Sequence, residues 1–182
     1  MGGMVGATGG MMAAQRSPSA MKRVIRRRIA EAAAALAIRD PNPHSKAIIK
    51  KLDEPISMSF NEETPLEDVL KYVHQATVTK TYNGIPIYVD PKGCKEAEAT
   101  MTSTIRGLDL EGVPLKTTLR LLLKQLGLAY GVRDGVLIIS SEQDILDELG
   151  DALREFDSKD NMEGGPGGFG GAAPEPPGGG SE

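Results

Sequence analysis

One arrangement of apolar and polar positions occurs twice in this chain. The motif P-L-x-x-x-L-x-x-[VL] begins at Pro65 and again at Pro114. A strand-like run precedes each proline and a short apolar run follows each helical stretch: 56–60 and 85–89 in the first copy, 108–110 and 128–132 in the second. Each copy therefore predicts a strand, a helix and a strand, and two copies can bury one core. The motif places Leu70 and Leu119 at equivalent core positions.

Start and stop signals define the expected helices. Thr64 is an N-cap candidate, followed by Pro65 at the first helical position and Glu67 as the acid of a capping box. Gly127 is expected to end the second helical stripe as its C-cap. The remaining helices are predicted at 19–38, at 45–52 with Ser45 as its cap, and from Ser141 to Phe156 with Asp144 as capping-box acid.

The strands are predicted from alternation and from turn residues. Residues 102–110 read as one strand whose alternation changes phase at Gly107, which a bulge would explain. Asp134 and Gly135 lie between two apolar runs and predict a tight hairpin. Pro86 has no N–H to give to a sheet ladder, so we expect the run 85–89 at a sheet edge.

These elements predict an α+β fold in the order β-α-β-β-α-β-β, with two helices packed on small sheets and further helices at the flanks. Composition divides the chain into a disordered start (1–20), a basic helical segment (21–53), the α+β domain (54–141), an amphipathic helix (142–157) and a disordered Gly/Pro-rich tail (158–182). No stretch reaches the roughly 18–20 consecutive apolar residues of a membrane-spanning helix.

The order of these motifs resembles the short N-terminal domain that secretins and TonB-dependent receptors share. The resemblance covers residues 56–141 and rests on three runs: ISMSFNEETPLEDVLKYVHQA, GIPIYVDPKG and LDLEGVPLKTTLRLLLKQLGLAYGVRDGVLIIS. It implies a small cell-envelope domain that has two helices against two small sheets and serves as a docking surface for other proteins. A location in the envelope or periplasm is implied by the resemblance alone, because we identify no signal peptide in the chain.

Catalytic and metal-binding motifs are missing from the sequence. It contains no H-E-x-x-H, G-x-S-x-G, C-x-x-C or G-x-x-x-x-G-K-[ST] motif. The two histidines, His44 and His74, are not accompanied by a pattern of thiols or carboxylates, and the single Cys94 is expected in a loop as an ordinary thiol. We therefore expect a non-enzymatic protein with no catalytic residues, no cofactor and no metal site, which acts by binding another protein.

The expected partner-binding residues are Ile87, Tyr88 and Val89. At a sheet edge they would offer unpaired backbone groups beside apolar side chains, and such an edge invites strand addition by a partner segment. The alternative at this edge is that the last helix, or a self-association contact, covers it.

Charge changes from basic to acidic along the chain. Residues 1–55 carry 10 Lys and Arg against 4 Asp and Glu, whereas residues 142–182 carry 2 against 11. The basic part contains five cations on an expected helix that could contact phosphates or an anionic surface: Lys22, Arg23, Arg26, Arg27 and Arg28. No aromatic residue interleaves with them and the pI is about 5.3, which argues against nucleic acid. Anion binding through 22–28 is therefore the alternative to protein docking.

Overall fold

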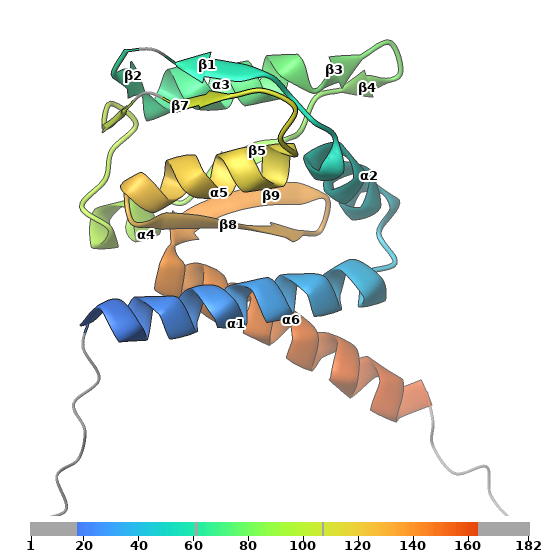
Figure 1. The fold of residues 1–182 in the computed structure, drawn as a ribbon. Coiled ribbons are helices and arrows are strands. Elements are labelled where there is room, and N and C mark those ends of the chain that lie inside the picture. The colour runs from blue at the N-terminus through green and yellow to red at the C-terminus, as the bar shows by residue number, and fades with distance from the viewer. Residues whose placement is uncertain (1–17, 61, 107, 164–182) are drawn as a thin grey trace, which may run out of the picture.

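Helices are interspersed with groups of strands along the chain in this computed structural model, which describes residues 18–60, 62–106 and 108–163 (Figure 1). The helices are α1 (Pro18–Arg39), α2 (Pro43–Asp53), α3 (Leu66–Ala76), α4 (Pro91–Glu96), α5 (Leu115–Gln125) and α6 (Glu142–Glu163). The strands are β1 (Met58–Phe60), β2 (Thr64–Pro65), β3 (Val78–Thr79), β4 (Tyr82–Asn83), β5 (Ile87–Val89), β6 (Thr104–Ile105), β7 (Leu108–Leu110), β8 (Leu128–Arg133) and β9 (Val136–Ser141). The fold is α+β, as the sequence predicts.

The segments that the sequence predicts to be disordered lie mostly outside these described residues. Of the segment 1–20, residues 18–20 begin α1, and of the segment 158–182, residues 158–163 belong to α6. The last helix therefore extends beyond the predicted boundary at residue 157.

The main sheet has three strands in the order β5-β9-β8. β8 and β9 form an antiparallel hairpin whose pairs run from Leu128↔Ser141 to Arg133↔Val136. β5 joins the other side of β9 in parallel, with Ile87 opposite Leu137. The other strands of the described residues form two-stranded pairs, β1-β7, β2-β6 and β3-β4.

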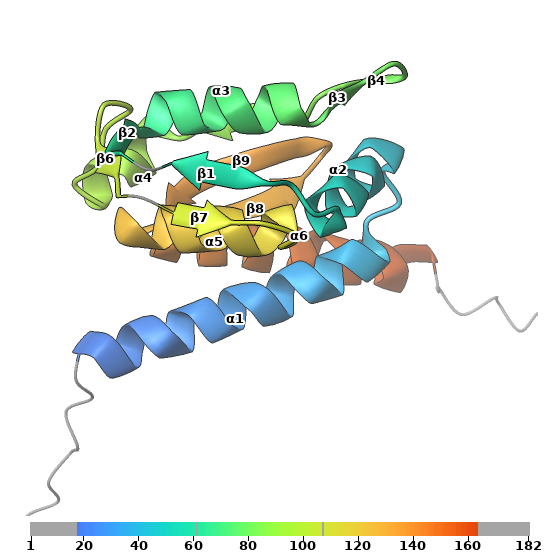
Figure 2. The same ribbon diagram turned by 45° about the horizontal axis from the view of Figure 1, so that its top comes forward.

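Helices α3 and α5 pack against the main sheet and the β1-β7 pair to form the main core (Figure 2). Each helix has an amphipathic stripe, of leucine and valine in α3 and of leucine with Thr118 in α5, and the positions have the spacing expected for one buried helix face. Leu70 and Leu119, the positions that the repeated motif makes equivalent, both lie in this core and are 6% and 0% exposed. Their predicted burial is confirmed.

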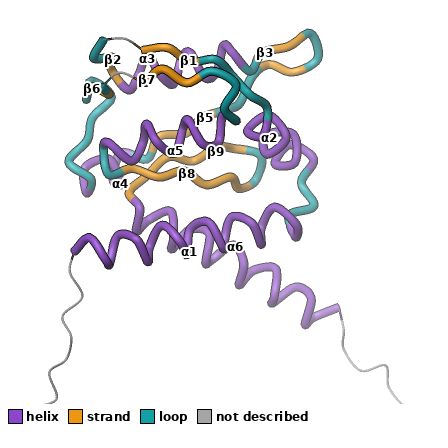
Figure 3. The backbone as a smooth tube through the Cα atoms, viewed as in Figure 1, coloured by secondary structure: helices purple, strands orange, loops and turns teal. Residues whose placement is uncertain are grey.

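Helices α1 and α6 form a second layer on the other face of the β8-β9 hairpin (Figure 3). Leu36 of α1 and Leu149 of α6 are buried there and pack against Ala129 of β8 and Ile138 of β9, which are partly buried. The neighbours of Ile138 along β9, Leu137 and Ile139, enter the main core instead. Because both faces of β9 are covered, its sequence is a continuous apolar run rather than an alternating one.

Three turn and cap signals form at the predicted residues or next to them. Asp134 and Gly135 have φ angles of 53° and 79°, the left-handed pair that a two-residue type I′ hairpin requires. Gly127, with φ of 69°, directly follows the C-cap of α5. At the start of α6, Ser141 Oγ accepts a hydrogen bond from the N–H of Asp144 at 3.1 Å, as a cap does. The Asp144 carboxylate, predicted as the capping-box acid, instead accepts a hydrogen bond from Ser140 Oγ.

The predicted capping box at Thr64 does not form. Thr64 and Pro65 stay extended as β2 and pair with β6, so α3 begins at Leu66 without a side-chain cap. Backbone carbonyls satisfy the helix start instead, because Leu66 N–H donates to Ser103 O at 2.9 Å and Glu67 N–H donates to Met101 O at 3.0 Å. The sheet pairing of residue 64 thus takes precedence over its capping propensity.

The predicted strand at 102–110 is two strands that pair with different partners. β6 pairs with β2 and β7 pairs with β1, so the chain changes partner between them. This change accounts for the altered phase of the apolar residues. Gly107, the predicted bulge, lies outside the described residues.

The loop expected around Cys94 is instead the short helix α4. Asp90 caps this helix, since its carboxylate accepts hydrogen bonds from the N–H groups of Lys92 and Gly93 at 3.1 and 2.8 Å. Cys94 therefore lies in a helix and not in a loop, and its side chain is buried. Burial raises the pKa of the Cys94 thiol, with a smaller contribution from the Asp90 charge in the same direction.

Helix α2 begins two residues before its predicted cap. Asn42 is the N-cap and accepts a hydrogen bond from His44 N–H at 2.9 Å. Ser45, the predicted cap, is buried and accepts a hydrogen bond from Gly135 N–H at 2.9 Å, so it fixes α2 to the β8-β9 turn.

Candidate docking groove along strand β8

Strand β8 forms one edge of the main sheet, and its outer side carries unpaired backbone groups. In a hairpin closed by two residues, the pair that flanks the turn exchanges both backbone hydrogen bonds, and here that pair is Arg133 and Val136. Along the two strands, hydrogen-bonded residue pairs then alternate with pairs that are not hydrogen-bonded. Leu128, Tyr130 and Val132 therefore direct their N–H and C=O groups away from β9. Among the described residues, no backbone hydrogen bond joins these groups to another element.

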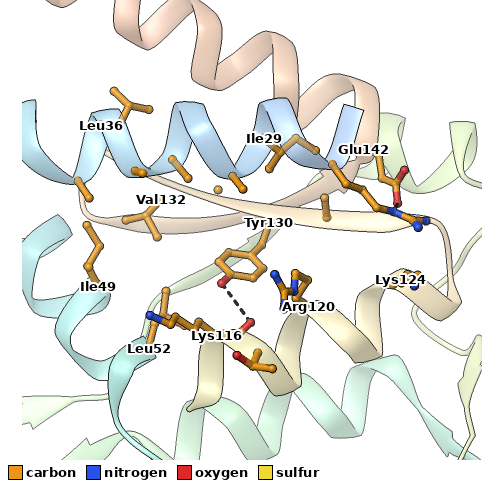
Figure 4. Close-up of a pocket in the computed structure, with 18 of the residues that line it drawn as sticks. Ile29, Leu36, Ile49, Leu52, Lys116, Arg120, Lys124, Tyr130, Val132 and Glu142 are labelled. Atoms are coloured by element: carbon orange, nitrogen blue, oxygen red, sulfur yellow. Dashed lines mark hydrogen bonds and ion pairs between the residues drawn. The ribbon is translucent and has the colours of Figure 1, made fainter. Parts of the chain in front are cut away.

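A groove of about 780 Å³ runs along this edge, between α1 and α5 (Figure 4). We call it the β8 groove. Helix α1 contributes mainly small side chains to it, and α5 contributes mainly cations: Ala30, Ala33, Ala34 and Ala37 from α1, and Lys116, Arg120 and Lys124 from α5. The groove therefore has a backbone edge as its floor, one apolar wall and one basic wall.

Tyr130 fixes the spacing between β8 and α5. Its side chain extends toward α5, and its hydroxyl donates a hydrogen bond to Lys116 O at 3.3 Å (Figure 4). Burial raises the pKa of Tyr130 to about 12, so the hydroxyl stays protonated at neutral pH and keeps this donor role. The Tyr130 side chain thus supports the floor of the groove, and its hydroxyl does not occupy the outward backbone groups of β8.

Ion pairs mark the two ends of the groove. At the α2 end, Lys116 Nζ lies 2.6 Å from Asp53 Oδ1. At the other end, Arg26 Nε lies 2.6 Å from Glu142 Oε1, and the Glu142 side chain is only 10% exposed. A third carboxylate in the lining, Asp40, accepts a hydrogen bond from Asn42 N–H at 2.8 Å in the turn between α1 and α2. The acids of the groove are therefore already engaged.

Two cations on the α5 wall form no ion pair among the described residues. Arg120 and Lys124 are exposed on one face of α5, and neither forms an ion pair within the described part of the chain. Both side chains lie beside the groove in Figure 4. The charge that the groove leaves available to a ligand is therefore positive.

The predicted docking residues lie at the opposite edge of the same sheet. Pro86 O accepts from Leu137 N–H at 2.9 Å and Asp90 N–H donates to Ile139 O at 2.8 Å, so the intervening Ile87 and Val89 direct their backbone groups away from β9. This places β5 at a sheet edge, as Pro86 predicts. The Tyr88 side chain is 53% exposed, whereas Ile87 and Val89 are partly buried against the main core.

The predicted basic run lies along the first part of α1. Arg26 is held by Glu142, and Arg27 Nε lies 2.7 Å from Glu31 Oε1 in an exposed pair four residues apart. Lys22, Arg23 and Arg28 are exposed and form no ion pair among the described residues. The run therefore offers three available cations rather than five.

A cluster of polar side chains outside the β8 groove joins α4, β9 and α6. The buried Ser140 hydroxyl lies 2.9 Å from Asp90 Oδ2 and 3.1 Å from Asp144 Oδ2. Hydrogen bonds lower the pKa of Asp90, chiefly the one from Gly93 N–H and then those from Ser140 and Lys92. No histidine accompanies this serine to act as a base, and each group has a structural partner. The cluster ties three elements together.

The described residues show no metal-binding or membrane-spanning feature. They hold no group of three or more His, Cys, Asp and Glu side chains placed to bind a metal ion. No described helix is long and apolar enough to cross a membrane. Comparisons with protein-family models, with curated proteins and with solved structures give no significant match.

Sequence reasoning identifies β8 as a strand but does not identify the groove. Whether β8 is an edge depends on where β5 inserts, and the pairing of β5 with β9 joins positions 87 and 137. The alanine-rich stretch of α1 is visible in the sequence, but its place beside β8 follows from packing on α6. Arg120 and Lys124 have no distinguishing pattern apart from their spacing of four residues.

Proposed function

We propose that this protein is a non-enzymatic docking module that binds an extended segment of another protein by strand addition. The observation that carries the proposal is the open edge of β8, lined along its length by the β8 groove. An added strand would satisfy the outward groups of Leu128, Tyr130 and Val132, and exposed strand edges are established sites for such pairing. The proposal agrees with the docking role that the resemblance to the secretin and TonB short N-terminal domain implies.

The two edges of the sheet are not equal candidates. β8 has six residues and a groove beside it, whereas β5 has three. Six residues span about 20 Å at about 3.3 Å per residue, and three span about half of that. The longer edge can form more main-chain hydrogen bonds, so we place the main docking site at β8 and keep Ile87, Tyr88 and Val89 as the second site.

Peptide selection followed by amide hydrogen exchange tests the proposal. Random seven-residue peptides are displayed on phage and selected on the full chain, and the amides of the best complex are followed by NMR. We expect exchange to slow at Leu128, Tyr130 and Val132. Selection of no peptide, or binding that leaves these amides and those of Ile87 and Val89 unchanged, would contradict docking by strand addition.

A pair of proline variants locates the edge that is used. Val132→Pro removes one outward N–H from β8 while leaving the ladder to β9 intact, and Val89→Pro does the same at β5. We expect only Val132→Pro to abolish peptide binding. Thermal melts check that both variants fold, and the exchange measurement on the wild-type chain decides the question if one does not.

An alternative function is anion binding by α1. It is favoured by one observation, the exposure of Lys22, Arg23 and Arg28 without ion pairs among the described residues. Binding of this kind would weaken steeply with added salt, whereas strand addition to an apolar groove would not.

A further inference from the structure

The charge of the β8 groove indicates what kind of segment it accepts. Asp53 and Glu142 are neutralised by Lys116 and Arg26 at the two ends. Arg120 and Lys124 remain on the α5 wall without an ion pair among the described residues. A ligand in the groove therefore meets two available positive charges from one side and alanine side chains from the other.

The spacing of these cations matches the repeat of a strand. Arg120 and Lys124 are four residues apart on α5, and α5 lies alongside β8 in Figure 1. Four helical residues rise about 6 Å along the helix axis. Two residues of a strand span about 6.6 Å, and side chains two apart point to the same face. Two acids at positions i and i+2 of an added strand would thus lie opposite Arg120 and Lys124.

The other face of such a strand would meet α1. The alanines of that wall leave room beside the floor, and the partly exposed Ile29 adds apolar surface. Small or β-branched apolar residues between the acids would fill this space and favour the extended backbone. The unpaired backbone edge of β8 favours a peptide over other ligands, because a peptide backbone alone supplies donors and acceptors at the strand repeat.

We propose that the partner segment is an extended peptide in which acidic residues alternate with apolar ones, bound along β8 with its acids toward Arg120 and Lys124. This inference rests on the proposed docking function and adds the chemistry of the ligand. It also assigns Arg120 and Lys124 as the residues that determine specificity.

Three synthetic nonapeptides test strand docking and the preference for acidic residues separately. The first alternates glutamate with valine, the second alternates lysine with valine, and the third is the glutamate peptide with every backbone nitrogen methylated. Dissociation constants are measured by fluorescence anisotropy with the full chain. We expect the glutamate peptide to bind at least about tenfold more tightly than the lysine peptide, and the methylated peptide not to bind, since N-methyl groups block main-chain pairing.

A charge-reversal variant assigns the preference to named residues. Arg120→Glu with Lys124→Glu should reverse the preference, so that the lysine peptide becomes the tighter ligand. The matched control is Lys46→Glu with Lys50→Glu, which makes the same change at the same spacing on α2, outside the groove lining. We expect the control to keep the preference for the glutamate peptide within about twofold.

The outcomes separate the two proposals. If both charged peptides bind equally and the methylated peptide does not, strand docking stands and the acidic preference is wrong. If the methylated peptide binds as well as the glutamate peptide, or if no peptide binds, strand docking itself is wrong. If phosphatidylserine vesicles bind through Arg120 and Lys124 and displace the glutamate peptide, the groove faces an anionic surface and the peptide assignment is overturned.

Discussion

Replacing Leu70 and Leu119, the equivalent leucines of the two repeated units, tests whether both positions contribute to stability as buried core residues. Leu119 is 0% exposed and Leu70 is 6% exposed, and both lie in the main core. A change from Leu to Ala removes about three carbon groups, and each contributes about 0.8 kcal/mol when buried. The cavity left behind adds to this loss, so we expect a decrease of about 2–5 kcal/mol in the free energy of unfolding at each site.

Urea unfolding followed by circular dichroism provides the measurement. The midpoint should fall while the slope stays unchanged if each variant loses only stability. Leu121 on the same helix is the matched control, because it is 37% exposed, and Leu121→Ala should cost less than about 1 kcal/mol. A loss under about 1 kcal/mol at Leu70 or Leu119, or an equal loss at Leu121, would refute the equivalence of the two units.

Three further results are expected. Asp90→Asn should lower the free energy of unfolding at neutral pH, and the difference in stability between the variant and the wild-type protein should narrow as the pH falls below about 4. The reason is that the hydrogen bonds that lower the pKa of Asp90 stabilise the fold only while its carboxylate is charged. A difference in stability that does not depend on pH in urea melts would contradict this. Cys94 should react with a thiol reagent at pH 8 far more slowly in the folded chain than in urea, because it is buried and its thiol pKa is raised. Equal reaction rates in the two conditions, followed by absorbance, would show that the thiol is accessible to the reagent in the folded chain. Arg23→Glu with Arg28→Glu should leave binding of the glutamate peptide unchanged in anisotropy titrations, whereas a large loss would favour the basic part of α1 as the site.

Long periodic elements were predictable because their own residues determine them. The stripes of α3 and α5 and the Asp134-Gly135 hairpin carry strong local signals, and all three form. The pair β3-β4 has two residues in each strand, too few to establish an alternation. Helix α4 carries valid start signals, an Asp followed by a Pro, but six residues are too few for an apolar stripe.

The docking groove was not predictable, because it is a product of tertiary packing. A strand exposes its outer backbone groups only after the order of the sheet is set, and that order depends on the parallel addition of β5. The two helices that form the walls, α1 and α5, are far apart in the sequence. The predicted edge at Ile87 to Val89 was accessible to sequence reasoning because a single residue, Pro86, carries the signal.

The sheet pairings also have consequences for the order of folding. β8 and β9 close across two residues, and the adjacent α6 is fixed to β8 by the ion pair of Arg133 with Glu148 at 2.7 Å. Helix α1 joins α6 through Arg26 and Glu142, which are 116 positions apart, and such a loop closes with a larger entropic cost. We expect the hairpin to form before α1 docks. During that interval the edge of β8 has only one wall, and refolding at high protein concentration should then favour edge-to-edge association of chains.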